Sequence, residues 1–179
     1  MRITTDHAGR AQALAELFAR SFAVAEDPEA GALIRGLVQD LLSQVPAPEL
    51  RVFMAEDAGT IIGAAIFTPL TFAEDPRRVV LLSPVAVAPE RQRQGVGRAM
   101  LHHELADLRT DAVDAAITYG DPAYYGRVGF RPIAEAQARA PLPLSQPQGW
   151  LGQSLTGPDM PVLRGASRCV APLDRADIW

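Results

Sequence analysis

A basic turn containing two glycines follows an apolar stretch in the middle of the chain and opens a segment with helical periodicity. The apolar stretch covers residues 79–88, and the turn carries Gly95 and Gly97 among arginines and glutamines. The first turn of a helix leaves backbone N–H groups without intrahelical acceptors and carries about half a positive charge. Glycine lets a ligand approach the backbone because it has no Cβ. These residue types in this order predict a phosphate-binding loop.

Two common nucleotide-binding loops fit this turn poorly. The chain contains no G-x-x-x-x-G-K-[ST] sequence, which is the pattern of a P-loop. A dinucleotide-binding loop needs a third small residue where Met100 stands, and it follows its strand directly. Here residues 89–94 separate the strand from Gly95. The turn therefore suits a different phosphate-bearing ligand.

The residues around the turn follow the pattern V-x-P-x-x-Q-x-x-G-x-G, which resembles the acyl-coenzyme-A loop of the GNAT N-acetyltransferases. The matching residues are Val87, Pro89, Gln92, Gly95 and Gly97. Because the pattern is short, a second motif is needed to support the resemblance.

That second motif is the sequence Gly-Asp-Pro-Ala-Tyr-Tyr-Gly-Arg-Val-Gly-Phe at residues 120–130. It resembles the other GNAT signature, a short helix with a tyrosine four residues before a Gly-Phe pair. Two motifs in this order are more specific than either alone. The resemblance covers residues 50–133 and is closest to the bacterial subgroup that carries a DPAYYGR-x-GF motif.

The GNAT resemblance implies an α/β fold with a mixed, mostly antiparallel central sheet flanked by helices and split between the fourth and fifth strands. In such a sheet, backbone groups at the split bind the pantetheine arm of the coenzyme. The implied co-substrate is acetyl-CoA, the commonest donor in the family. The implied coenzyme-binding residues are Val85, Ala86, Val87, Gln92, Arg93, Gln94, Gly95, Val96, Gly97, Arg98 and Tyr124.

Two groups are expected to act on the thioester. The resemblance places Tyr125 at the position of the family's general acid. A phenol with a pKa of about 10 stays protonated at neutral pH and can protonate a thiolate whose conjugate acid has a pKa near about 8.5. The backbone N–H of Val87 is expected to polarise the thioester carbonyl. Alternatively, Tyr124 and Tyr125 both face the core or the pantetheine arm.

The general base is not evident from the sequence. Family members often use a carboxylate on the hairpin or on the split strand, sometimes through water, and Ser83 stands where such a group would project. The acidic residues nearby in sequence are Glu56, Asp57, Glu74 and Asp75. Acidic residues in loops are usually solvated, so none of the four is singled out.

Other reactive residue types have ordinary explanations. His102 and His103 are adjacent on a predicted helix and face different directions, so we expect no metal site. Cys169 has no activating neighbour in sequence and is expected to be a small buried hydrophobe. Arg127 and Arg131 either contact coenzyme phosphate or face solvent.

Composition limits the class of protein. The 179 residues are 48% hydrophobic and 21% charged, as expected for a single domain over residues 1–179. A net charge of −4 argues against a nucleic-acid partner. The single cysteine and the absence of an apolar leader favour a cytoplasmic location. No apolar stretch is long enough to cross a membrane.

Apolar periodicity predicts the elements that must position these residues. Two amphipathic helices are expected over residues 14–22 and 33–42, after a short first strand. A further helix follows the glycine-containing turn. Longer strands are expected at residues 51–56, 60–68, 78–88 and 112–118, the first two joined as a hairpin and the third the longest.

Pro84 is unusual in the middle of a predicted strand, because proline cannot donate to a hydrogen-bond ladder. The GNAT resemblance explains it as the place where the strand bulges and parts from its neighbour. A plain edge strand explains Pro84 as well.

The C-terminal third has fewer signals. Asp121 and Pro122 are expected to begin the short tyrosine-bearing helix, and Gly129 to end it. A long loop follows over residues 138–165, strand-like at residues 150–155, and residues 167–173 are a candidate last strand.

The sequence therefore predicts an acetyl-CoA-dependent N-acetyltransferase in which an amine attacks the thioester directly in a ternary complex. The acceptor is a small-molecule amine or a peptide amine. A non-catalytic acyl-CoA-binding regulatory domain is the alternative, because no general base is evident. Trp179 looks exposed at the end of the chain, which hints at a homodimer.

Overall fold

The computed structural model describes residues 1–179, which form two compact units. The first unit comprises Met1–Phe67 and Pro84–Glu104, and the second comprises Thr68–Ser83 and Leu105–Trp179. The chain therefore passes from one unit to the other three times. None of the helices combines the length and the hydropathy that a membrane-spanning helix requires.

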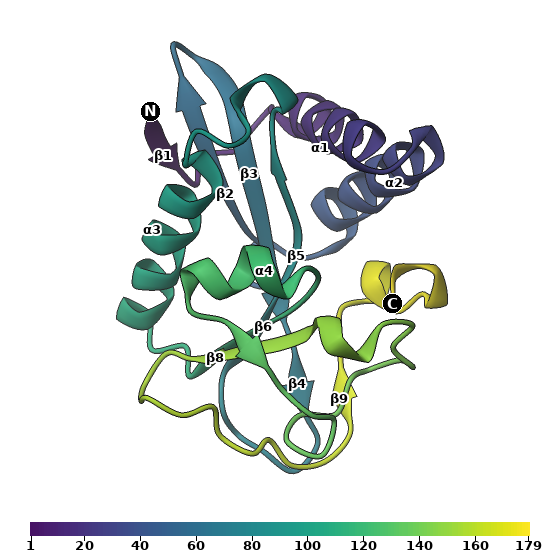
Figure 1. Cartoon of the computed structure of the whole chain (residues 1–179), viewed down its shortest axis with the longest axis vertical. Coiled ribbons are helices and arrows are strands. Elements are labelled where there is room, and N and C mark those ends of the chain that lie inside the picture. Colours follow the sequence, from purple (N-terminus) through teal and green to yellow (C-terminus); the bar gives the residue numbers. More distant parts are fainter. The chain divides into compact units, whose positions relative to one another are not determined.

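Two helices of the first unit, α1 (Ala11–Ala25) and α2 (Pro28–Gln44), lie side by side (Figure 1). Asp27 begins α2, since its side chain accepts a hydrogen bond from the backbone N–H of Ala30 at 2.8 Å. The helices meet at Gly31, where a Cβ would lie 2.6 Å from the carbonyl oxygen of Ala19. Both predicted helices are confirmed, each longer than its apolar pattern.

The strands of the first unit form an antiparallel arrangement of β1 (Arg2–Thr4), β2 (Arg51–Asp57) and β3 (Thr60–Pro69). Ala58 and Gly59 join β2 to β3 with φ values of 47° and 79°. Positive φ at both central residues is the geometry of a type I′ turn, which matches the twist of a hairpin. The predicted hairpin is confirmed.

The second unit contains the parallel part of the sheet. The first half of β5 (Val79–Val87) pairs in parallel with β6 (Ala115–Tyr119), which pairs in antiparallel with β8 (Trp150–Ser154). Strand β7 (Arg131–Pro132) follows β8 at the edge. The order β1-β2-β3-β5-β6-β8-β7, flanked by helices, confirms the predicted mixed, mostly antiparallel α/β fold.

Two short strands, β4 (Thr71–Phe72) and β9 (Ser167–Arg168), form a separate antiparallel pair. Because β4 intervenes, the predicted fourth and fifth strands carry the labels β5 and β6. The predicted last strand over residues 167–173 is mostly wrong, since only its first two residues are extended and Ala171–Leu173 form a 3₁₀ helix.

The ladder between β5 and β6 is interrupted two residues before Pro84. It runs from Val79 to Leu82 and stops, and the hydroxyl of Thr118 donates to the carbonyl of Leu82 at 2.9 Å. The boundary between the two units falls between Ser83 and Pro84. The sheet thus splits between β5 and β6, the predicted fourth and fifth strands. The alternative of a plain edge strand does not hold for residues 79–82 of β5, because β6 pairs with them.

Strand β5 also carries a bulge against β3. The N–H of Leu70 donates to the carbonyl of Val79, and the N–H of Ala88 donates to the carbonyl of Ile62, each at 2.9 Å. Between these two bonds β5 advances nine residues and β3 eight, so β5 has one extra residue. An extra residue without a ladder partner provides a place for proline.

Helix α3 (Val96–Thr110) ends in a tight turn that shortens the next strand. Ala112 adopts a left-handed φ of 56°, its N–H bonds Arg109 O, and the N–H of Val113 bonds Leu108 O. This is a Schellman motif with alanine in the usual place of glycine. Strand β6 therefore begins at Ala115, three residues later than predicted. The prediction that β5 is the longest strand is also wrong, because β3 has 10 residues and β5 has 9.

Trp179 is buried, which corrects the expectation of an exposed C-terminal indole. It is 6% exposed, its Nε1 donates to Leu173 O at 2.7 Å, and its ring stacks on Tyr119 with centroids 5.9 Å apart. Trp150 contacts it edge-on at 5.8 Å. The structure thus removes the feature that hinted at a homodimer.

A buried carboxyl group interrupts the apolar face of α3. Glu104 is fully buried, and neither of its carboxyl oxygens has a hydrogen-bond partner. Leu101 and Leu108, three residues before it and four after it, lie on the same face, and together with Leu105 they are the predicted buried stripe. Burial raises the pKa of Glu104 to about 8, so the side chain is protonated at neutral pH.

The helix contact at Gly31 predicts a stability difference between two glycines of α2. Gly31→Ala should lower the free energy of unfolding by about 1–3 kcal/mol, because the new methyl group overlaps Ala19 and Ala23. Gly36→Ala is the matched control: its Cβ meets nothing within 4 Å, so it should stabilise the helix by about 0.5–1 kcal/mol. Urea unfolding of the three proteins measures both effects, and equal stabilities would contradict the packing.

The raised pKa of Glu104 predicts a pH-dependent stability. From the ordinary pKa of 4.5 up to about 8, the unfolded state loses the Glu104 proton while the native state keeps it. Stability should therefore fall as pH rises through this window, by about 1.4 kcal/mol per pH unit. Glu104→Gln stays neutral and should lack this component. Urea unfolding of both proteins at pH 5, 6, 7 and 8 measures it, and parallel profiles would refute it.

Candidate active site

The predicted phosphate-binding loop lies between a 3₁₀ helix, Pro89–Arg91, and the start of α3. Arg93 and Gly95 adopt left-handed φ values of 61° and 82° within it. Left-handed residues alternating with others turn successive N–H groups toward one side and form an anion-binding concavity. A Cβ on Gly95 would meet no protein atom within 4 Å, so this side of the loop is open.

Helix α3 begins directly at this loop. Its first hydrogen bond runs from the N–H of Ala99 to the carbonyl of Gly95 at 2.9 Å. The amides between these residues precede any intrahelical acceptor, so they are available to an anion. They belong to Val96, Gly97 and Arg98.

Polar side chains hold the loop from its base. Gln92 Nε2 donates to Val87 O at 3.1 Å, and Gln94 Nε2 donates to Glu90 O at 3.0 Å. Both glutamines therefore bond backbone of the loop or of the strand before it. We infer that the two glutamines shape the loop, while its backbone amides face outward.

Arginines around the loop fall into two groups. Arg20 and Arg91 are neutralised by carboxylates, at 2.8 Å from Glu90 and 2.7 Å from Asp57 respectively. The exposed Arg93 and Arg98 lie in no ion pair. The free positive charge of this region therefore sits on the loop and on the first turn of α3.

The end of β5 is fixed by a contact that the sequence did not reveal. The carbonyl of Val87 accepts a hydrogen bond from Ser21 Oγ at 3.1 Å, in addition to the one from Gln92. Ser21 is a buried residue of α1, 66 positions away in sequence. Only a pattern of covarying positions could have linked the two. This contact joins α1, β5 and the loop within the first unit.

Tyr125 lies on a single-turn helix, α4 (Pro122–Tyr125), in the second unit. Asp121 begins the helix by accepting a hydrogen bond from the N–H of Ala123 at 2.8 Å. After one more 3₁₀ turn the segment ends at Gly129, whose φ is 97°. The predicted start and end of this segment are confirmed.

The ring of Tyr125 is positioned by close packing. A Cβ on Gly120 would lie 2.7 Å from the ring, so glycine is required at the end of β6. The ring also contacts Tyr124 and Phe130 edge-on, with centroids 5.0 and 5.7 Å apart. The role of Gly120 could have been suspected from its place at the head of the second motif.

Glu56 is an unsuitable general base. Its carboxylate is buried and bonds two arginines, Arg2 at 2.8 Å and Arg10 at 2.9 Å. The hydrogen bond from Arg2 lowers the pKa of Glu56, with a further contribution from Arg10. A carboxylate stabilised in its ionised form is a weak proton acceptor.

Two of the other three acidic candidates are also engaged. Asp57 pairs with Arg91, and Asp75 is buried and pairs with Arg77 at 2.7 Å. Asp75 also accepts the N–H of Arg164, which ties two loops of the second unit together. Glu74 is exposed. The structure thus gives structural roles to Glu56, Asp57 and Asp75.

The remaining reactive side chains show no activation. Cys169 is half-buried, and burial raises the pKa of its thiol to about 11, which disfavours the reactive thiolate. His102 and His103 are exposed on α3. No group of three or more His, Cys, Asp or Glu side chains is arranged to hold a metal ion.

The predicted site residues thus divide between the two units. The first unit brings together the second half of β5, with Val85–Val87, and the loop and helix start at residues 92–98. Tyr124 and Tyr125 belong to the second unit, as do Arg127 and Arg131. Arg127 is exposed, and Arg131 bonds the carbonyl of Phe130 at 3.2 Å.

Solved structures share this fold. The chain is similar to the Escherichia coli GNAT family N-acetyltransferase YhbS in complex with CoA, with a TM-score of 0.79 and 24% identity. The similarity covers 98% of this chain and 92% of YhbS. A GNAT family acetyltransferase from Brucella melitensis in complex with acetyl-CoA gives a TM-score of 0.70 over 97% of both chains, again at 24% identity.

Sequence comparisons identify relatives and the family. The uncharacterized N-acetyltransferase YjhQ of Escherichia coli K12 is 33% identical over 141 residues, which are 76% of this chain and 77% of YjhQ. YhbS from the same strain is 31% identical over 94 residues, 52% of this chain and 56% of YhbS. The family model of the acetyltransferase (GNAT) domain matches residues 3–133. With most of its length matched by that model and three quarters aligned to YjhQ, the chain belongs to the GNAT family of N-acetyltransferases.

Proposed function

We propose that this protein transfers an acetyl group from acetyl-CoA to a primary amine, by direct attack in a ternary complex. The observation that carries the proposal is the open loop with left-handed Arg93 and Gly95, which joins the half of β5 that β6 does not pair to the start of α3. The two similar solved structures that contain CoA and acetyl-CoA support this choice of ligand.

The loop suits the pyrophosphate of the coenzyme. Amides of Val96, Gly97 and Arg98 would donate to phosphate oxygens, aided by the positive end of α3. Arg93 and Arg98 would neutralise the charge, because neither is engaged in an ion pair. Arg91 is not assigned this role, because Asp57 already neutralises it.

The second half of β5 suits the pantetheine arm. Its residues lie beyond the last β6 partner, Leu82, so amide groups of the arm can take the place of a neighbouring strand. Val85, Ala86 and Val87 would supply these contacts. Ser21 and Gln92 hold the carbonyl of Val87 in place, which orients the peptide groups on both sides of it.

Acetyl transfer can then be assigned to two groups. The amine nitrogen attacks the thioester carbon, a C–N bond forms, and the N–H of Val87 stabilises the developing oxyanion. The C–S bond breaks, and the departing thiolate takes the proton of Tyr125. Because Glu56, Asp57 and Asp75 are held in ion pairs, the proton of the amine is released to water, and water returns a proton to the Tyr125 phenolate.

The same ion pairs favour one alternative, a regulatory domain that binds acyl-CoA without turnover. Such a protein needs the loop and the open half of β5 but has no use for a general base. The two functions differ in whether the hydroxyl of Tyr125 matters for a reaction. Release of coenzyme thiol from acetyl-CoA, measured across polyamines, amino acids and peptides, separates them.

The first variant tests the general acid. With the amine that gives the highest turnover, Tyr125→Phe should lower kcat by about 10²-fold, because the thiolate leaves unprotonated, and should leave coenzyme affinity nearly unchanged. Tyr119→Phe is the control, since it also removes a phenol but one bonded to Gln146 N at 2.6 Å. It should affect stability rather than kcat. Unchanged turnover in Tyr125→Phe would remove the assignment.

The second variant tests the loop. Gly95→Asp should weaken acetyl-CoA binding by about 10²-fold or more, because it strains a φ of 82° and places a negative charge against phosphate. Gly59→Asp is matched in both respects, with a φ of 79° and open space around its Cβ, but lies in the β2–β3 turn. In calorimetric titration with acetyl-CoA, Gly59→Asp should keep normal affinity and Gly95→Asp should not. Normal affinity in Gly95→Asp would refute the site.

A further inference from the structure

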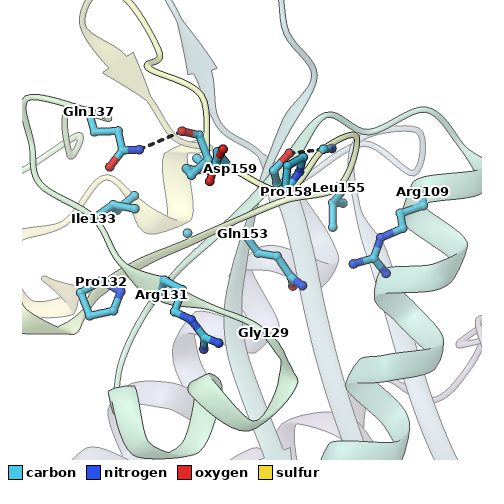
Figure 2. Close-up of a pocket in the computed structure, with 14 residues that line it drawn as sticks. Arg109, Gly129, Arg131, Pro132, Ile133, Gln137, Gln153, Leu155, Pro158 and Asp159 are labelled. Atoms are coloured by element: carbon cyan, nitrogen blue, oxygen red, sulfur yellow. Dashed lines mark hydrogen bonds between the residues drawn. The ribbon is translucent and has the colours of Figure 1, made fainter.

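A pocket of about 460 Å³ lies in the second unit, outside the residues assigned to the coenzyme. It is formed by the last turn of α3, Gly129, β7, β8 and the loop at residues 157–160 (Figure 2). None of its lining residues belongs to β5, to the phosphate-binding loop or to α4. The proposed acetyl transfer therefore gives this pocket no role.

Two arginines and a glutamine line this pocket. Figure 2 shows the side chain of Gln153, from β8, between Arg109 of α3 and Arg131 of β7. Arg109 is exposed and lies in no ion pair. Arg131 Nη1 is held by the carbonyls of Gly126 and Phe130 at 3.4 and 3.2 Å. These bonds fix one guanidinium and leave its other nitrogens free to donate to a ligand.

The carboxamide of Gln153 has an unmet hydrogen-bonding need. Its Oε1 is buried and has no partner. Gly129 makes room for this group, since a Cβ there would collide with Gln153 Nε2. A buried carbonyl oxygen without a donor is costly, so a ligand that supplies one is favoured.

The other walls fit the carbon body of a small molecule. Five apolar side chains contribute to them, those of Pro132, Ile133, Leu155, Pro158 and Met160, beside the polar Gln137 and Ser154. Asp159 is the one acidic residue in the lining, against two arginines. The lining thus carries a net charge of +1, from two positive groups and one negative, on a chain whose net charge is −4.

We propose that this pocket binds a small organic anion, a carboxylate or a phosphate monoester, that carries a hydroxyl or ammonium donor next to the charge. The anionic group bonds Arg109 and Arg131, the carboxamide of Gln153 turns so that its Oε1 accepts the ligand's donor, and the carbon body covers the apolar side chains of the wall. The lining residues hold the anion without reacting with it.

Calorimetric titration of the whole chain with two probes distinguishes the sources of the anion. Glycerol 3-phosphate presents a phosphate monoester with hydroxyls, and malate presents carboxylates with a hydroxyl. At least one should bind with one site per chain, and uncharged glycerol should not bind. Arg109→Gln and Arg131→Gln should each weaken binding about tenfold or more. Arg139→Gln is the charge-matched control, since Arg139 is exposed in the same unit but outside the pocket.

Two further titrations separate this pocket from the coenzyme site. Anion binding should persist in Gly95→Asp and in the presence of saturating acetyl-CoA. The proposal would be overturned if neither probe binds, or if Gly95→Asp or acetyl-CoA abolishes the binding. It would also be overturned if Arg109→Gln and Arg131→Gln both leave the affinity unchanged. The readout is binding heat rather than turnover, so failure of the anion proposal would leave the proposed acetyl transfer untouched. Failure of the acetyl-transfer proposal would likewise leave the anion pocket untouched.

Discussion

The interrupted hydrogen-bond ladder along β5 is the constraint on which the rest of the first unit depends. Buried backbone groups need partners, and β6 supplies them only as far as Leu82. Beyond that point Pro84 has no N–H to donate, and β5 carries an extra residue against β3. The hydroxyl of Thr118 bonds the last paired carbonyl, and Ser21 with Gln92 bonds the carbonyl of Val87. Side chains thus bond the strand at both ends of the segment that β6 does not pair.

Pairing of charges gives an acidic protein a locally basic surface. The net charge is −4, yet carboxylates neutralise the arginines that support the structure: Glu56 takes Arg2 and Arg10, and Asp57 takes Arg91. Arginines outside such pairs then determine where anions are attracted. Salt screens exposed charges beyond about 8–10 Å, so an anion is attracted mainly by unpaired arginines that lie within this distance. The distribution of partners, rather than the number of arginines, thus decides which surfaces attract phosphate or carboxylate.

Local signals explain what the sequence could predict. The β2–β3 turn, the Asp121 cap, the Gly129 end and the interruption near Pro84 each depend on the conformational limits of one or two residues, so they are legible without the fold. The contact between Ser21 and Val87 spans 66 positions and leaves no local trace. Ala112 ends α3 in a conformation that normally indicates glycine, so the start of β6 was misplaced. Burial of Trp179 depends on Tyr119 and Trp150, which only the folded chain brings together.

The aromatic contacts of Trp179 have a spectroscopic consequence. The chain contains two tryptophans, and both lie in one cluster with Tyr119 in the second unit, while the first unit has none. Intrinsic fluorescence therefore reports on the second unit alone, and circular dichroism in the far ultraviolet, which includes α1 and α2, reports strongly on the first. If the two signals change at the same denaturant concentration, the units unfold as one cooperative body. The two native tryptophans can therefore be used to measure how strongly the two units are coupled by the segments that pass between them, strands β3 and β5 and helix α3.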